Sequence, residues 1–142
     1  MDAFKIKELD HVVLRVTDVE RGVAFYRDVL GCVIYRRQDT LKFVQMYAGR
    51  SAIDLADTSG PIGKEGGTPP ALAQGHNMDH LCLRVEPYDE AALIQHFESH
   101  GVKPFDITKR YGADGFGPCM YIRDPFGNMI ELKGPPEPPP AS

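Results

Sequence analysis

The chain contains the same eight-residue pattern twice. Residues 9–16 read LDHVVLRV and residues 78–85 read MDHLCLRV, so five of the eight positions are identical. The shared histidines, His11 and His80, lie 69 residues apart in a chain of 142 residues. A repeat of this period indicates that one supersecondary unit is used twice. The fold is therefore expected to consist of two similar halves, each with a histidine at the same position.

The first copy predicts a βαβββ unit. Period-two alternation in residues 9–16 gives one apolar face for a helix and one mixed face that carries His11. Thr17 and Glu20 form a candidate capping box, in which Thr17 is the N-cap of a helix over residues 18–30 that Gly31 ends. Three strands are then expected, at residues 32–37, 41–47 and 51–56.

The second copy predicts the same order. A strand at residues 78–85 is followed by a helix at residues 89–100, and three strands are expected at residues 102–106, 118–123 and 128–133. Residues 57–77 are rich in Gly and Pro and residues 107–117 are rich in Gly, which predicts two loops that border a site. The expected organisation is a lead at residues 1–8, a first module at 9–56, a linker at 57–77, a second module at 78–133 and an extended, disordered, proline-rich tail at 134–142.

Composition narrows the class of protein. A hydrophobic share of 42% and a charged share of 25% are typical of a globular protein. The net charge of −4 gives no basic footprint for nucleic acid. The apolar runs are far shorter than the roughly 20 residues that span a membrane, and the N-terminus has no signal-peptide pattern. Three widely spaced cysteines without a CxxC pair favour reduced thiols and a cytoplasmic protein over a disulfide framework or a structural zinc site.

The repeat brings polar residues into register. It aligns His11 with His80 and Asp54 with Glu131, and all four fall on the face opposite the apolar one. A single strand histidine is usually a hydrogen-bonded structural residue, but two histidines and two carboxylates in register favour a divalent metal site. Imidazole with carboxylate suits Zn, Ni, Fe or Mn. Whether the shorter Asp54 is a direct ligand stays open.

These motifs resemble those of the vicinal oxygen chelate superfamily. The resemblance rests on the two repeated strands, on Phe25-Tyr26 followed by Leu30-Gly31, and on DPFGNMIEL at residues 124–132, and it covers residues 9–133. That superfamily includes glyoxalase I, methylmalonyl-CoA epimerase, fosfomycin-resistance enzymes, extradiol dioxygenases and bleomycin-resistance proteins. The resemblance implies an α+β fold in which two tandem βαβββ modules form a cupped, incomplete barrel. It also implies a metal bound by residues that match His11, His80 and Glu131, whereas Asp54 departs from the Glu, Gln or His that is common at the fourth position.

The resemblance leaves three functions to weigh. The first is a metal-dependent lyase or isomerase of the glyoxalase I-like type, which acts on vicinal oxygens of a small substrate through an enediolate-like anion. Its catalytic base would be Glu131 or Asp54. The alternatives are an extradiol-type dioxygenase with a two-His, one-carboxylate iron site and a metal-free binding protein of the bleomycin-resistance type. The extradiol signature has a histidine shortly before Tyr121, where this chain has residues 112–114, GAD.

Further residues are candidates for contact with a small-molecule substrate. Arg15 and Arg84 share the mixed face with the histidines and could hold substrate anions, although partial exposure at a strand end is the favoured explanation for them. Arg110 and Tyr111 lie in the second predicted loop, and Tyr121 lies in the strand that follows it. The resemblance also implies a homodimer.

Overall fold

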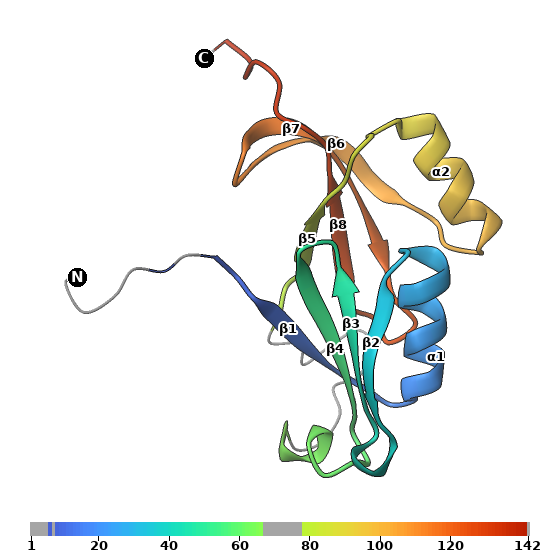
Figure 1. Cartoon of the computed structure of the whole chain (residues 1–142). Helices are drawn as coiled ribbons and strands as arrows, with labels where there is room; N and C mark the ends of the chain where they lie inside the picture. The colour runs from blue at the N-terminus through green and yellow to red at the C-terminus, as the bar shows by residue number, and fades with distance from the viewer. Residues whose placement is uncertain (1–5, 7, 67–77, 142) are drawn as a thin grey trace. The chain divides into compact units, whose positions relative to one another are not determined.

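The chain forms two compact units, which we call module 1 (residues 1–69) and module 2 (residues 70–142) (Figure 1). The structure is a computed structural model and describes residue 6, residues 8–66 and residues 78–141. Each module contains a four-stranded sheet with the element order βαβββ. This confirms the α+β class and the tandem modules that the repeat predicts.

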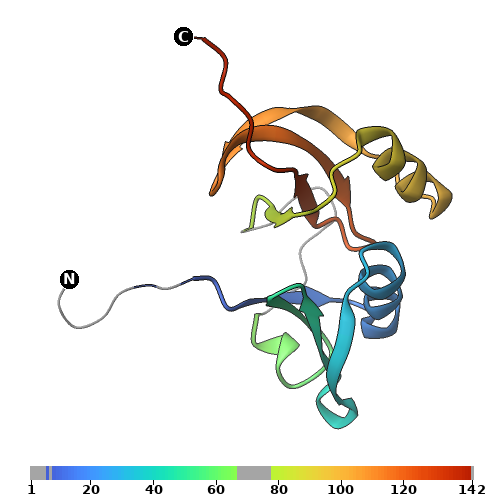
Figure 2. The same cartoon turned by 45° about the horizontal axis from the view of Figure 1, so that its top comes forward.

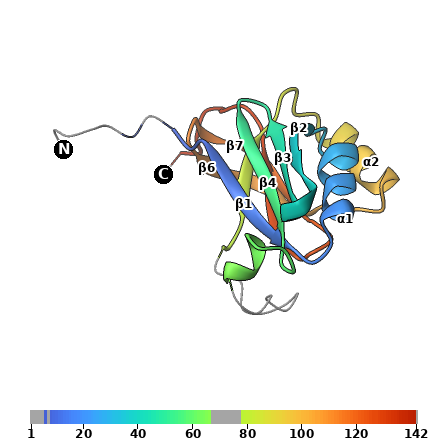
Figure 3. The ribbon, with the colours of Figure 1, turned by 60° about the horizontal axis from the view of Figure 1, so that its bottom comes forward.

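Module 1 contains a mixed sheet with α1 on one side (Figure 3). The strand order is β1-β4-β3-β2, in which β1 and β4 are parallel and the other neighbours are antiparallel. Its strands are β1 (His11–Val16), β2 (Val33–Gln38), β3 (Phe43–Ala48) and β4 (Ser51–Asp57). Its helical segments are α1 (Val19–Ala24), the π-helical η1 (Phe25–Val29), and the 3-10 helices η2 (Asp39–Leu41) and η3 (Gly63–Gly66).

The start of α1 corrects the predicted capping box. Asp18 is the N-cap, not Thr17: its backbone is extended and its carboxylate accepts a hydrogen bond of 3.1 Å from the backbone N–H of Arg21. Thr17 directly follows β1, so the chain turns into the helix one residue later than the capping-box pattern suggested. The helix also changes to π geometry from Phe25, and Gly31 follows it with a φ of +76°.

Module 2 repeats this topology. Its sheet has the order β5-β8-β7-β6, again with a parallel pair, β5 and β8, and otherwise antiparallel neighbours. The elements are β5 (Leu81–Arg84), α2 (Glu90–Ser99), β6 (Phe105–Gly112), β7 (Gly115–Arg123) and β8 (Met129–Lys133). His80 therefore lies just before β5 rather than within it.

Residues 107–117 are not the loop that their glycine content suggested. They form most of a long hairpin, in which β6 pairs with β7 from Phe105 to the turn between Gly112 and Gly115 (Figure 2). Gly115 has a φ of +121°, which the tight turn requires. A Cβ atom at Gly117 would lie 2.5 Å from the carbonyl oxygen of Pro135. The glycines thus serve a turn and a close approach of the tail.

The expected disorder of the tail is wrong for its first residues. The backbone N–H of Gly134 donates to the carbonyl of Pro118 at 2.8 Å, and that of Glu137 donates to the carbonyl of Phe116 at 2.6 Å. Glu137 also forms an ion pair of 2.5 Å with Lys109. The tail therefore runs along the hairpin.

Within the predicted linker, Asp57 belongs to β4 and η3 follows it, whereas residues 67–77 lie outside the described part of the chain.

The apolar strand faces form the cores of the modules. Leu14, Val16, Ile53 and Leu55 are buried in module 1, and their counterparts on β8, Ile130 and Leu132, are buried in module 2. The three cysteines are free. Among the described helices, none has the length and apolar character needed to cross a membrane.

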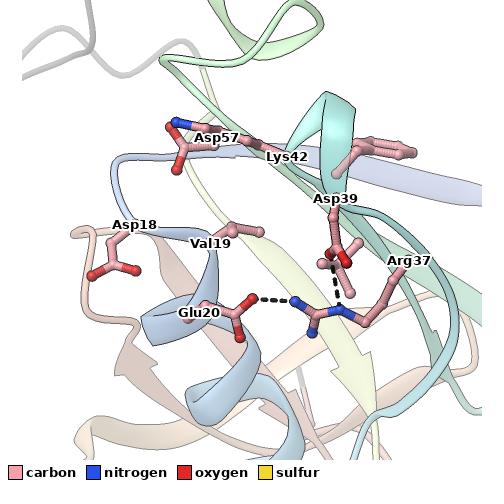
Figure 4. Close-up of a pocket in the computed structure, with 9 residues that line it drawn as sticks. Asp18, Val19, Glu20, Arg37, Asp39, Lys42 and Asp57 are labelled. Carbon is pink, nitrogen blue, oxygen red and sulfur yellow. Dashed lines mark hydrogen bonds and ion pairs between the residues drawn. The ribbon is translucent and has the colours of Figure 1, made fainter.

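A charged surface pocket lies beside the start of α1 (Figure 4). Within it Arg37 forms ion pairs with Glu20 and Asp39. The buried Asp57 accepts hydrogen bonds from the backbone N–H and the hydroxyl of Ser59, at 2.9 and 2.6 Å. Burial raises the pKa of Asp57, but the hydrogen bonds from Ser59 and Val19 and the charge of Lys42 together outweigh it, so that the pKa lies below its ordinary value. The pocket is thus explained by contacts that fix the end of β4.

We expect Asp57→Ala to lower the free energy of unfolding by about 1–3 kcal/mol at pH 7, because it removes the hydrogen bonds that Ser59 and Val19 donate to a buried carboxylate. The folded pKa is lower than the unfolded value near 3.8, so this contribution is complete above that value and is lost as the pH falls through the folded pKa. Urea unfolding at a series of pH values measures it. Asp39→Ala, at an exposed acid of the same pocket, is the control and should change stability by less than about 0.5 kcal/mol. An equal effect of both variants at pH 7 would contradict the assignment.

Candidate functional site

In module 1, His11 and Asp54 meet on the sheet face opposite α1. Nε2 of His11 lies 4.0 Å from Oδ2 of Asp54. The carboxylate is almost fully buried, with 2% of the residue exposed, and Oδ2 accepts a hydrogen bond of 3.4 Å from the side-chain amide of Gln45. Its other oxygen, Oδ1, is buried and has no hydrogen-bond partner among the described residues. A buried acceptor without a partner favours a ligand at this position.

Module 2 contains the equivalent pair. Nε2 of His80 lies 3.1 Å from Oε1 of Glu131, and the same oxygen accepts a hydrogen bond of 3.0 Å from the hydroxyl of Tyr121. Glu131 is buried, with 5% of the residue exposed. Burial and the bond to Glu131 raise the pKa of Tyr121 to about 12, which keeps its hydroxyl a hydrogen-bond donor at physiological pH.

The two carboxylates are positioned by the same rule of strand pairing. Asp54 lies directly opposite Gln45 on the antiparallel neighbour β3, and Glu131 lies directly opposite Tyr121 on β7. Directly opposed side chains on one sheet face are close enough to bond. Gln45 was not among the residues predicted from the sequence, and Tyr121, a predicted substrate contact, donates a hydrogen bond to Glu131.

Both histidines are oriented by the aspartate that precedes them, which the sequence analysis also missed. Nδ1 of His11 lies 2.7 Å from the carboxylate of Asp10, and Nδ1 of His80 lies 2.6 Å from that of Asp79. An ionised carboxylate only accepts hydrogen bonds, so Nδ1 carries the proton and Nε2 is left for the inner carboxylate. The signal was available, because the Asp-His dipeptide occurs in both copies of the repeat.

This geometry fits a bound cation. With the proton on Nδ1, a neutral imidazole presents a lone pair at Nε2, and that lone pair faces a carboxylate oxygen in both modules. Two acceptors in this arrangement need a positive charge between them, either a proton or a metal ion. Carboxylate–histidine pairs that leave Nε2 for a metal are common in metalloproteins. The donor types, imidazole and carboxylate, suit Zn, Ni, Fe or Mn.

Each module supplies only part of a ligand set. Within the described residues, no group of three or more His, Cys, Asp or Glu side chains is arranged to hold a metal ion. Protein metal sites generally use three or four protein ligands. One histidine–carboxylate pair alone is therefore an incomplete site.

Module 2 has a cavity of about 280 Å³ beside its pair. It brings together His80, Glu131 and two predicted substrate contacts, Arg84 and Tyr111, and it is also lined by Cys82 and Lys133. Arg110 does not line it; this residue forms an ion pair of 2.8 Å with Asp106, and its guanidinium lies 5.9 Å from the ring centre of Tyr121.

The last predicted contact, Arg15, lies in module 1. Its Nε donates a hydrogen bond of 2.8 Å to the carbonyl oxygen of Gly63, in the 3-10 helix that follows β4. A Cβ atom at Gly66 would overlap the Arg15 side chain, at 2.3 Å from Nε. The side chain of Arg15 therefore packs against η3.

Comparison with known proteins identifies the family. Residues 8–132 match the model of the "Glyoxalase/Bleomycin resistance protein/Dioxygenase superfamily". The chain belongs to this superfamily. It is 30% identical over 131 residues to the glyoxalase domain-containing protein RDO1 of Mycosarcoma maydis, with coverage of 89% of this chain and 68% of RDO1. It is 29% identical over 149 residues to a lactoylglutathione lyase of Pseudomonas aeruginosa, with coverage of 87% and 80%.

A solved structure shows the same fold. The crystal structure of a virulence protein from Salmonella typhimurium superposes with a TM-score of 0.76 at 24% sequence identity, over 93% of this chain and 99% of that chain. Membership of the superfamily agrees with the paired βαβββ modules. The candidate residues for a site are the two pairs, His11 with Asp54 in module 1 and His80 with Glu131 in module 2.

We expect Asp10→Asn to lower the pKa of His11 in metal-free protein. The hydrogen bond to Asp10 and then the charge of Asp54 raise the pKa of His11 above its ordinary value of 6.5, because both favour the imidazolium. An NMR titration of the His11 ring protons measures the change. Glu8→Gln, at another acid of the same segment, is the control and should leave the pKa of His11 unchanged. An unaltered His11 titration in Asp10→Asn would contradict the orienting role of Asp10.

Proposed function

We propose that this protein is a metal-dependent enzyme of the glyoxalase I-like type, acting on a small substrate with vicinal oxygens. The observation that carries the proposal is the duplicated pair, in which a histidine oriented by the preceding aspartate turns Nε2 to a buried carboxylate. The similarity to a lactoylglutathione lyase supports the same class of chemistry.

In this proposal His11, His80 and Glu131 bind one divalent metal ion, which is Zn, Ni, Fe or Mn. Asp54 either binds directly or through a water molecule, because its arm is shorter and its oxygen lies farther from the histidine than that of Glu131, at 4.0 against 3.1 Å. When bound, the metal supplies a Lewis acid for the vicinal oxygens of the substrate. The two pairs come from one chain or from two chains of a dimer.

Glu131 is the proposed base. The hydroxyl of Tyr121 donates a hydrogen bond to its Oε1 and so fixes the carboxylate, and burial keeps water away from it. Glu131 would accept a proton from the substrate carbon that lies next to the vicinal oxygens. Asp54 is the second candidate. Burial raises its pKa, against the opposing effects of Gln45 and His11, and a carboxyl with a raised pKa suits the uptake and return of a proton.

A second function follows from the same donor set. Two histidines and one carboxylate are the ligands of non-haem iron oxygenases, so an extradiol-type ring cleavage uses the same three residues. The third candidate, a metal-free binding protein for a small molecule, would leave the buried carboxylates unexplained. Metal content and substrate class separate these three functions.

We expect His80→Ala and Glu131→Gln to lose metal and Asp54→Ala to retain it. Loss of an outer partner of a ligand costs roughly 10–100-fold in metal affinity, so loss of a ligand should cost more than about 100-fold. Elemental analysis of the dialysed, metal-loaded proteins measures this. His96→Ala, at an exposed histidine of α2, is the matched control. Full retention of metal in all three variants would overturn the metal site and favour the binding protein.

The activity arm of this test uses the metal-loaded protein with methylglyoxal–thiol adducts, catechols and fosfomycin. We expect turnover of an adduct by the unaltered protein and its loss in Glu131→Gln. Cleavage of a catechol instead would favour the dioxygenase. Metal binding without turnover of any of the three would contradict the glyoxalase I-like assignment while leaving the site intact.

We also propose a homodimer. The strands β1 and β2 are the edges of one sheet, and β2 and β3 expose large apolar side chains, including Val33 at 62% and Tyr47 at 51%. Exposed edges and apolar patches favour association. Sedimentation at micromolar concentration should give twice the chain mass of 15.8 kDa. A species of one chain mass would contradict the dimer.

A further inference from the structure

Two cations lie side by side in the cavity of module 2. Arg84 on β5 and Lys133 on β8 are direct partners in the parallel strand pair, so their side chains leave the same face of the sheet. Both line the cavity that also contains His80 and Glu131. Like charges in directly opposed positions destabilise a sheet.

Lys133 is the more unusual of the two. It is buried, with 5% of the residue exposed, and its Nζ donates to the carbonyl oxygens of Arg110 at 2.7 Å and Gly117 at 3.2 Å. Among the described residues no carboxylate forms an ion pair with it. Two neutral carbonyls use two of the three N–H donors of an ammonium. Burial of a charge without an opposite charge is costly.

The surrounding hairpin is shaped to accommodate this lysine. A Cβ atom at Gly112 would lie 2.5 Å from Cε of Lys133, so a larger residue at position 112 would require the lysine stem to shift. The position of the ammonium is therefore built into the hairpin rather than left to a flexible surface side chain.

Arg84 forms ion pairs with two acids, of which Asp114 lines the cavity. Its guanidinium donates to Asp114 on the hairpin turn at 2.8 Å and to Glu86 at 2.5 Å. A guanidinium has five N–H donors, so further donors are available to a ligand. The remaining acid on this face, Glu131, is two residues from Lys133 and is engaged by His80 and Tyr121.

Module 1 provides an internal comparison. The counterparts of Arg84 and Lys133 in the repeat are Arg15 and Ala56, which are also direct partners in their strand pair. Arg15 bonds to a backbone carbonyl under η3, and Ala56 carries no charge. The pair of cations is thus a feature of module 2 and not of the βαβββ unit in general.

We propose that Lys133 and Arg84 bind an oxyanion, a carboxylate or a phosphate group, which is a substituent of the substrate. The identification of the anion as part of the substrate rests on the proposed function, whereas the binding itself needs no metal. A cavity of about 280 Å³ accommodates a small oxyacid. The substrates of this enzyme are therefore small anionic molecules, with the anionic group in module 2 beside His80 and Glu131.

The test uses the full chain, freed of metal by a chelator and kept in chloride at constant ionic strength. Inorganic phosphate and acetate are titrated separately, and the backbone amides of Gly112 and Gly134, which line the cavity, are followed by NMR. We expect saturable shifts with at least one of the two anions. Lys133→Met and Arg84→Gln should each weaken binding by about tenfold or more, and Lys103→Met, at an exposed lysine of module 2, should leave it unchanged.

Two results would overturn the proposal. The first is the same binding in Lys133→Met and Arg84→Gln as in the unaltered protein, or shifts that do not saturate. The second is binding only after metal loading, which would place the anion on the metal and leave the proposed function standing. Because Lys133→Met also removes two hydrogen bonds to the hairpin, its NMR spectrum without anion is checked for folding. Arg84→Gln, which leaves those bonds in place, keeps the test decisive if Lys133→Met does not fold.

Discussion

The parallel pairing of the first and last strands in each module is the constraint on which the site depends. In each module the first strand pairs in parallel with the last strand of the βαβββ unit, β1 with β4 and β5 with β8. A parallel pair needs a long crossover connection, which here includes the helix. Val13 therefore lies opposite Asp54, and Cys82 lies opposite Glu131. His11 lies two residues before Val13, and His80 lies two residues before Cys82. Each histidine therefore reaches the carboxylate of the neighbouring strand. One backbone register thus places an imidazole beside a buried acid in both halves.

Burial gives these pairs their chemistry. Asp54 and Glu131 lie in strands whose other face forms the core, so both carboxylates are taken out of water at a cost that a nearby positive charge would offset. The outer aspartates direct the imidazoles, and the residues across the sheet hold the carboxylates. The modules differ beyond this shared frame: module 2 adds two paired cations where module 1 has an arginine and an alanine. The two copies thus share the histidine–carboxylate pair and differ at the adjoining positions.

Periodicity and the repeat predicted the modules, the helices, most strands and the register of the four candidate ligands, because these depend on local alternation and on comparison of the two halves. The predictions failed where glycine or a cap has more than one structural use. Gly112, Gly115 and Gly117 suggested a loop, but they serve a hairpin turn, a lysine stem and the returning tail. Asp18 and Thr17 are both good N-caps, and only the exit of β1 decides between them.

The sequence by itself determined that one βαβββ unit occurs twice and that each copy has a histidine and an acid in register, since both facts are properties of the order of residues. Apart from the aspartate that precedes each histidine, only tertiary structure decided which side chains those residues contact. Strand pairing placed Gln45 and Tyr121 on the carboxylates, and it placed Lys133 beside Arg84, although 49 residues separate these two in the chain. Such contacts depend on which strands become neighbours, and a parallel neighbour distant in sequence leaves no local pattern to detect.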